Sequence, residues 1–402
     1  MAIAAWLLAL MLAEPAATAR RIVPRKTGAA SYESKPAGES AFNPFGDPLR
    51  AAITRAIVET GRKRGTKVVP DTRLDAAMTD LARSLREGEH PYSAAVEFVL
   101  SHHGVVEPYP KLRYVRGERR AETAMMELLL RDVPLPDGRR LATVGVGIDR
   151  DTSSLLLMVA VQEKTLDLDP VPRQVPAAAK VRVSGRLLGD LTRPHLYVTD
   201  PQGAPRKLPA TTKGALFGAD LACDRGNGRY QVEVFGDGAT GPTVLANFPL
   251  YCGVPPPATF GSAAGYTADA RLKPADAEAR LLELVNRDRR AAGLPPVAPD
   301  PALAVVARAH SQDMMAGSFI GHISSTTGNP GDRVKRAGLS FRRLAENVGR
   351  NNSVEDLETG LMASPGHRSA ILDREATHVG IGVAIGTPTP DAIVIYGTQL
   401  FR

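Results

Sequence analysis

Apolar residues in the first part of the chain follow a helical period and then a strand period. They recur every three or four positions over residues 46–132, which predicts helices. At 143–148 they alternate with glycine, and 155–161 is an almost continuous apolar run, which is typical of a buried strand. These patterns predict an N-terminal α+β domain over residues 46–169.

The middle of the chain shows short strand patterns separated by turn residues. Apolar and aromatic residues mark the predicted strands, which are 181–187, 195–198, 230–235 and 243–248. This spacing predicts a small all-β sandwich over residues 177–254, followed over 255–270 by a linker rich in Pro, Gly and Ala. Cys223 and Cys252 are the only cysteines of the chain, so we expect one disulfide, which forms in an oxidising compartment.

Helical patterns followed by strand patterns close the chain. Ser353 and Asp356 have the spacing of a capping box ahead of a helix. Strands are predicted at 379–385 and 393–401. This order of elements predicts a further α+β domain over residues 271–402, so the expected fold class of the chain is α+β with several domains.

The two α+β segments resemble each other in sequence. An alignment of their helical parts places Asp71 opposite Asp300. A V-G-V-G or V-G-I-G motif then begins 73 residues later at Val144 and 79 residues later at Val379. We expect an internal duplication whose first copy has degenerated; a chance similarity between two Ala-rich helical segments is the alternative.

Residues 1–19 have the features of a secretory signal peptide. An apolar run at 3–13 precedes the A-x-A pattern of Ala17 and Ala19. The run is shorter than the roughly 20 residues that cross a membrane, so we expect cleavage, no stable membrane span afterwards, and a secreted or periplasmic protein. Residues 20–45 have no periodicity and are predicted to be a flexible leader.

Composition limits the classes of partner. Hydrophobic residues make up 43% of the chain and charged residues 23%, which is typical of a globular protein. Aromatic residues make up only 5%, so stacking platforms for nucleic acid are not expected. The net charge of +7 is spread along the chain, which predicts a solvated basic surface with mild attraction to anionic walls or lipids.

Three polar motifs in the last segment, GHIS, AEN and SPGHR, carry ionisable residues. They contribute His322, Glu346 and His367. His367 falls in the first turn of a predicted helix, where the helix dipole keeps the ring neutral. Two imidazoles and a carboxylate could bind Zn²⁺ or another divalent metal, or act as base and orienting acid. The alternative is that they only hold their loops, whereas His310, on an apolar helical face, is predicted to be a core histidine.

In this order the motifs resemble a bacterial member of the CAP superfamily, which is also called SCP-like or cysteine-rich secretory. The resemblance covers roughly residues 275–402. It implies an α-β-α sandwich, an extracellular setting and a ligand-binding cleft lined by the two histidines and the glutamate named above. The chain departs from many members at Leu361, where they have tryptophan, and the place of Glu358 relative to the cleft stays open.

Resemblance to a family implies a fold more directly than an activity. Our first hypothesis is a secreted, non-catalytic protein that binds a ligand, such as a small lipid or another envelope component, or a divalent metal in the His/Glu cleft. The second is a metal-assisted or His/Glu-based hydrolase of envelope peptides, for which Ser324 and Ser364 are the hydroxyls nearest the motifs. The third is a purely structural or interaction protein.

Overall fold

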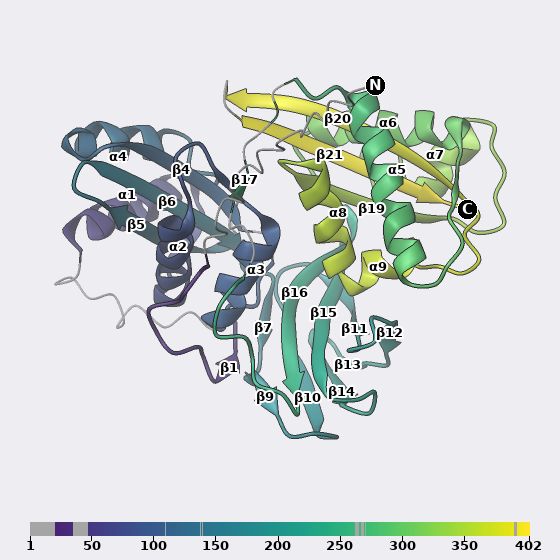
Figure 1. The fold of residues 1–402 in the computed structure, drawn as a ribbon, viewed down its shortest axis with the longest axis horizontal. Coiled ribbons are helices and arrows are strands. Elements are labelled where there is room, and N and C mark those ends of the chain that lie inside the picture. The colour runs from purple at the N-terminus through teal and green to yellow at the C-terminus, as the bar shows by residue number, and fades with distance from the viewer. Residues whose placement is uncertain are drawn as a thin grey trace, which may run out of the picture.

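The computed structural model describes residues 21–34, 47–108, 110–136, 138, 140–261, 265–266, 269, 271–389 and 392–402. The predicted signal peptide, 1–19, lies outside these residues. The chain has the mixed α+β architecture that was expected, with an N-terminal body in blue, strands in teal below it and a C-terminal body in green to yellow (Figure 1). Within the described ranges, no helix is both long and apolar enough to cross a membrane.

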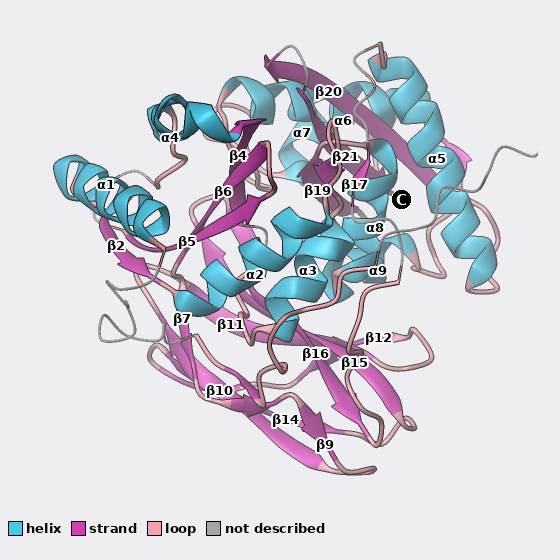
Figure 2. Ribbon diagram, turned by 60° about the vertical axis from the view of Figure 1, so that its left-hand side comes forward, coloured by secondary structure: helices cyan, strands magenta, loops and turns pink. Residues whose placement is uncertain are grey.

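The N-terminal body is a sheet with helices on both faces. Its strands lie in the order β2 (Lys67–Pro70), β5 (Leu141–Arg150), β6 (Ser154–Glu163) and β4 (Lys111–Glu118). Apolar side chains of α2 (Thr72–Ser84) and α3 (Ser93–His102) cover one face, and those of α1 (Pro48–Arg64) and α4 (Glu122–Arg131) cover the other (Figure 2).

The prediction of helices throughout 46–132 is wrong at β2 and β4. Strand β4 lies at an edge of the sheet and its inner residues are only partly buried. Leu112 and Tyr114 pack on one core and Val115 packs on the other, while Arg113 and Arg116 lie among them. An edge strand with this many arginines lacks the clear period of two by which a strand is identified in a sequence.

Apart from β8 (Val171–Pro172), the described strands between Leu166 and Cys252 form two sheets around one core. One has the order β13 (Thr211–Lys213), β14 (Leu216–Ala222), β10 (Lys180–Leu187) and β7 (Leu166–Leu168). The other has the order β12 (Pro205–Leu208), β11 (Thr192–Thr199), β15 (Gly228–Gly238), β16 (Gly241–Cys252) and β9 (Gln174–Val175). The four predicted strands lie within β10, β11, β15 and β16.

The disulfide between Cys223 and Cys252 is confirmed, and both cysteines are buried in the sandwich core. Cys223 follows β14 and Cys252 ends β16, so the bond links the two sheets. The sandwich begins earlier than the predicted 177, because β7 pairs with the end of β10.

Residues 21–34 are not the flexible leader that was expected. Ile22 forms a bridge with Phe260, and β1 (Ser31–Tyr32) pairs with β8 (Val171–Pro172). Ile22 and Tyr32 are fully buried, Tyr32 within the sandwich core. Two isolated apolar residues give no periodic signal, so only tertiary packing reveals their role.

The C-terminal body repeats the plan of the N-terminal one. Its strands lie in the order β18 (Ala298–Pro299), β20 (His378–Thr389), β21 (Ala392–Phe401) and β19 (Ala345–Asn351). Helices α5 (Pro274–Ala291), α8 (Val354–Ala363) and α9 (Pro365–Ile371) share one core with the sheet. Helices α6 (Pro301–Ala316) and α7 (Pro330–Arg336) pack on its other face.

Only half of the expected capping box forms at the start of α8. The Ser353 hydroxyl accepts a hydrogen bond from the Asp356 amide, as predicted. The Asp356 carboxylate instead accepts bonds from the amide and the hydroxyl of Ser93, at the start of α3. This side chain therefore joins the C-terminal body to the N-terminal one.

Glycines in the V-G-V-G motifs let a helix approach each sheet. A Cβ atom on Gly382 would lie within 3.0 Å of the backbone of Arg308 in α6, and one on Gly147 equally close to the backbone of Met78 in α2. The motif recurs because both sheets carry a closely packed helix at this place.

Gly382→Ala is therefore expected to destabilise the C-terminal body by about 1–3 kcal/mol, because the backbone of α6 must shift to make room. Gly360→Ala is the matched control, since the nearest atom to its added Cβ would be 3.9 Å away. Thermal unfolding followed by circular dichroism measures both. Equal midpoints for the two variants would show that α6 is not packed as described.

Candidate functional site

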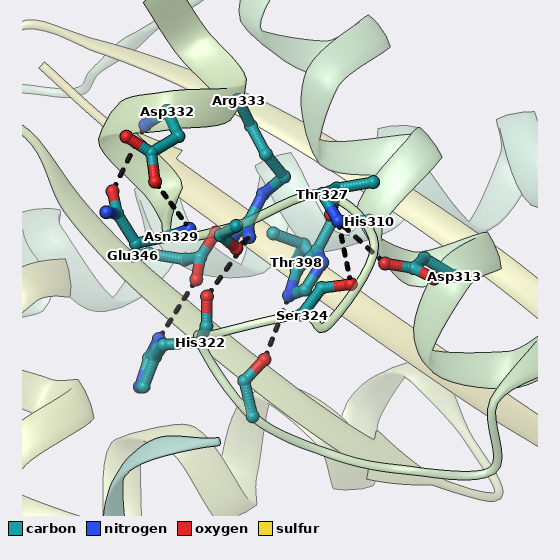
Figure 3. A network of polar contacts seen from close by, with 12 residues as sticks. His310, Asp313, His322, Ser324, Thr327, Asn329, Asp332, Arg333, Glu346 and Thr398 are labelled. Carbon is teal, nitrogen blue, oxygen red and sulfur yellow. Dashed lines mark hydrogen bonds and ion pairs between the residues drawn. The ribbon is translucent and has the colours of Figure 1, made fainter. Parts of the chain in front are cut away.

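The structure brings His322 and Glu346 into direct contact. His322 lies in the loop between α6 and α7, and Glu346 lies in β19. Nδ1 of His322 is 3.0 Å from Oε1 of Glu346 (Figure 3). His367, in the first turn of α9, lies near enough for the charge of His322 to lower its pKa. We refer to His322, Glu346 and His367 as the His/Glu cluster.

Glu346 orients its neighbours and is not free to bind a ligand. Its Oε2 forms an ion pair of 2.5 Å with Arg333 Nη2, and the two side chains are only 2% and 4% exposed. Arg333 Nη1 also donates to the backbone carbonyl of His322, at 3.0 Å. Both carboxylate oxygens are therefore used, and the guanidinium fixes the loop that carries the histidine.

This arrangement does not favour the metal centre that was predicted from His322, His367 and Glu346. Within the part of the chain that the structure describes, no group of three or more His, Cys, Asp and Glu residues is placed to hold a metal ion. A carboxylate that already pairs with a buried arginine is a poor third ligand, because binding a metal would leave that arginine unpaired.

His310 is the core histidine that the sequence predicts. It is fully buried, and its Nε2 donates to the carbonyl of Gly321 at 2.9 Å (Figure 3). Burial lowers its pKa, which keeps the ring neutral. Because Gly321 directly precedes His322, this bond fixes one end of the loop that carries the cluster.

Ser324 fixes the other end of that loop. Its hydroxyl oxygen accepts bonds from the amides of Thr326 and Thr327, and the hydroxyls of those threonines donate to Asp313. Ser324 is buried, and its hydroxyl holds the turn that follows it.

The local structure around His367 sets its tautomer. Ser364 caps α9, and its hydroxyl donates to Oε2 of Glu233 at 2.9 Å. Nδ1 of His367 lies 2.7 Å from the same hydroxyl oxygen. Because the one hydroxyl proton is given to Glu233, Nδ1 of His367 must carry its own proton and donate it to Ser364. The lone pair of the ring is then on Nε2.

Both histidines of the cluster are held through Nδ1, which leaves Nε2 of each ring without a hydrogen-bond partner in the described part of the chain. Nδ1 of His322 faces a carboxylate and therefore also carries a proton. Burial, with a further effect of His322, lowers the pKa of His367 to about 3, so its ring is neutral at physiological pH. Neither Nε2 is hydrogen-bonded to a described residue, so the two nitrogens remain available to a ligand.

The β-sandwich reaches the cluster. Thr240, in the turn between β15 and β16, accepts a bond of 2.9 Å from the amide of Ile323. Glu233 accepts bonds from Ser364 and, at 3.0 Å, from the amide of Gly366. His322 is 20% exposed, and these bonds place the cluster at a boundary between the C-terminal body and the β-sandwich.

Glu233 is a site residue that the sequence analysis missed. It is fully buried, and burial raises the pKa of its carboxyl to about 8. It lies between Val232 and Val234 in β15, which is the alternation of a strand with one solvated face. No signal in the sequence shows that the C-terminal body covers this face.

Glu358 lies beneath the cluster, connected to it through hydrogen bonds. Its carboxyl accepts from Gln399, whose side-chain oxygen accepts from Asn347, and Asn347 also donates to the carbonyl of His367. Glu358 is fully buried, and burial raises its pKa to about 8. It supports the site without lying beside the imidazoles.

Comparison with known proteins places this segment in a family. The model of the family described as "CAP: Cysteine-rich secretory protein family" matches residues 282–401. YkwD of Bacillus subtilis is 38% identical over 106 residues, which are 26% of this chain and 41% of that protein. The membrane protein YlbC of the same organism is 34% identical over 108 residues, 26% of this chain and 31% of that protein. The chain thus spans less than half the length of either relative.

A solved structure of an extracellular protein containing a SCP domain from Bacillus anthracis is 17% identical, with a TM-score of 0.28. The match covers 63% of this chain and 87% of that one. The match of the family model, together with the order of the GHIS, AEN and SPGHR motifs, decides the assignment. Residues 282–401 of this chain belong to the CAP family of cysteine-rich secretory proteins.

Proposed function

We propose that the CAP domain binds a small envelope ligand through the Nε2 atoms of His322 and His367, without catalysing a reaction on it. The observation that supports this proposal is that each Nδ1 is held by a neighbour, Glu346 or Ser364. Two imidazoles in fixed positions, each with a free Nε2, suit a ligand with hydroxyl or amide groups. Fragments of a wall polymer and the headgroups of lipids both carry such groups.

The hydroxyls beside the cluster support binding over hydrolysis. Ser364 is fully buried, caps α9 and donates to Glu233, and Ser324 is buried in its turn. A serine nucleophile needs an accessible oxygen whose proton passes to a base. Neither serine meets that requirement.

Secretion is part of the proposal. The signal-peptide pattern at 1–19 and the disulfide between Cys223 and Cys252 both suit an oxidising compartment outside the cytoplasm.

We also propose that the N-terminal body is a degenerate copy of the CAP domain. Both sheets pair a short strand in parallel with the penultimate strand, Pro70 opposite Val144 and Pro299 opposite Val379. The amide of the next residue, Asp71 or Asp300, then donates to the carbonyl of that valine. The same two registers align in sequence, which a chance similarity does not require.

On this proposal, the register indicates which site residue the first copy lacks. In the C-terminal body Phe401 pairs with Val379 and with Ala345, the residue before Glu346. In the N-terminal body Val161 pairs with Val144 and with Lys111, the residue before Leu112. Leu112 therefore occupies the place of Glu346, and the first copy acts as a scaffold.

His322→Ala/His367→Ala is expected to weaken binding of the envelope ligand by about tenfold or more, because two hydrogen bonds are lost. The probes are soluble peptidoglycan fragments and phospholipid vesicles, titrated into metal-free protein and followed by calorimetry. His378→Ala is the control, since this exposed ring bonds only to Thr377. Unchanged affinity in the double variant would refute the site. Peptide turnover that is lost in the double variant would instead establish the hydrolase.

A further inference from the structure

A second candidate site lies far from the cluster in sequence, around Arg173 between β8 and β9. Arg173 is buried, with 3% of its surface exposed. Its Nε and Nη2 atoms are buried and have no hydrogen-bond partner in the described part of the chain. A buried guanidinium without a counter-ion is costly, because desolvation is not repaid by an opposite charge.

A further polar atom without a partner lies near this guanidinium. Nδ1 of His102 is buried and has no hydrogen-bond partner in the described part of the chain. Tyr32 lies beside Arg173, whose charge and side-chain hydrogen bond oppose the rise in its pKa that burial causes. A Cβ atom on Gly28 would collide with Arg173 and lie 3.2 Å from His102, so both side chains meet at that glycine. Donors and an acceptor left unsatisfied at one place indicate a group that is missing from it.

Arg173 and His102 line a cavity of about 680 Å³, which is large enough for a small molecule. Its wall is formed by residues 23–30, the end of α3, the β8–β9 connection and residues 256–259. The exposed side chains of Arg25 and Lys26 also line it, and no lining residue is acidic. The cavity therefore has a positive rim and a buried positive group inside.

Two carboxylates in this part of the structure are already paired. Asp80 accepts bonds from His103 and from the amide of Arg25, and Glu97 forms an ion pair with Arg229. Neither is free to neutralise Arg173.

From this geometry we infer that the cavity is a binding site for an oxyanion, either a carboxylate or a phosphate group. A planar guanidinium pairs with such an anion through two parallel N–H groups. The unbonded Nδ1 of His102 can accept from a hydroxyl carried by the same ligand. The site is independent of the His/Glu cluster and of the function proposed for it.

Arg173→Met in the full chain tests this site. The probes are inorganic phosphate, acetate and vesicles of phosphatidylglycerol, with binding measured by calorimetry and by the shift in thermal midpoint. We expect phosphate or acetate to raise the midpoint of the wild type, and Arg173→Met to weaken that binding at least about tenfold. Without anion the variant should be as stable as the wild type or more so, because an unpaired buried charge has been removed.

Two further variants make the result decisive. Arg186→Met removes an exposed charge from β10 and should bind each probe as the wild type does. Arg25→Gln/Lys26→Gln changes only exposed side chains, so it should fold and bind the anion more weakly. Binding to vesicles but not to free phosphate would identify a lipid headgroup as the source of the anion. The inference is overturned if no probe binds the wild type, or if Arg173→Met binds with unchanged affinity.

Discussion

Arg289→Met is expected to destabilise the CAP domain by roughly 3–5 kcal/mol. The Arg289 side chain is fully buried and donates to the backbone carbonyls of Pro295, Ile371, Asp373 and Ala376. It therefore ties the end of α5 to the segment between α9 and β20. Removing it leaves several buried acceptors unsatisfied, each of which costs about 1–3 kcal/mol before the structure relaxes.

Urea unfolding measures this effect, with Arg290→Met as the control. Arg290 is the next residue of α5 and is exposed, so its loss changes the charge without removing a buried group. If the two variants unfold at the same urea concentration, Arg289 does not hold these carbonyls as described.

Glu233→Gln is expected to reduce the fall in the free energy of unfolding as the pH rises from 4.5 to about 8. The pKa of the Glu233 carboxyl is about 8 in the folded chain and 4.5 in the unfolded chain. Between these values the folded state holds a proton that the unfolded state loses. The stability that this group contributes is complete below pH 4.5 and is lost as the pH rises through about 8. A glutamine keeps the acceptor for Ser364 and Gly366 but has no proton to lose.

The free energy of unfolding, measured across this pH range, tests the prediction. Glu358 is the matched comparison, because burial raises its pKa to about 8 as well, within the CAP domain alone. Each glutamine variant should flatten the decline by a few kcal/mol at most, and the double variant should flatten it further. A Glu233→Gln profile parallel to the wild type would mean that the carboxyl is not buried between the two bodies.

The sequence predicts those elements in which one face packs on a core and the other faces solvent, because this gives a periodic pattern. Apolar and polar residues alternate in β10, β11, β15 and β16 because one face of each strand packs on the sandwich core. The cap at Ser353 is equally local, since it depends on one side chain and the Asp356 amide three residues later. Local patterns of this kind need no knowledge of the rest of the fold.

The features that the sequence did not reveal all depend on a partner far along the chain. Glu346 has the composition of a metal ligand, but Arg333 takes its second oxygen. Glu233 has the pattern of a solvated strand residue, but it packs against Ser364, 131 residues away. Arg173 is one of many arginines in the sequence, and only burial distinguishes it. Such contacts are fixed by tertiary packing and leave no trace in residue spacing.

The protonation of the cluster histidines tests the central claim most directly, since it requires no knowledge of the ligand. Long-range ¹H–¹⁵N spectra of histidine-labelled protein, assigned with the His322→Ala and His367→Ala variants, report which ring nitrogen carries the proton. Both rings should show a proton on Nδ1, and His367 should carry none on Nε2 and stay neutral until the pH approaches about 3. A His322 or His367 ring without a proton on Nδ1, or a His367 ring that becomes charged near pH 6.5, would contradict the account.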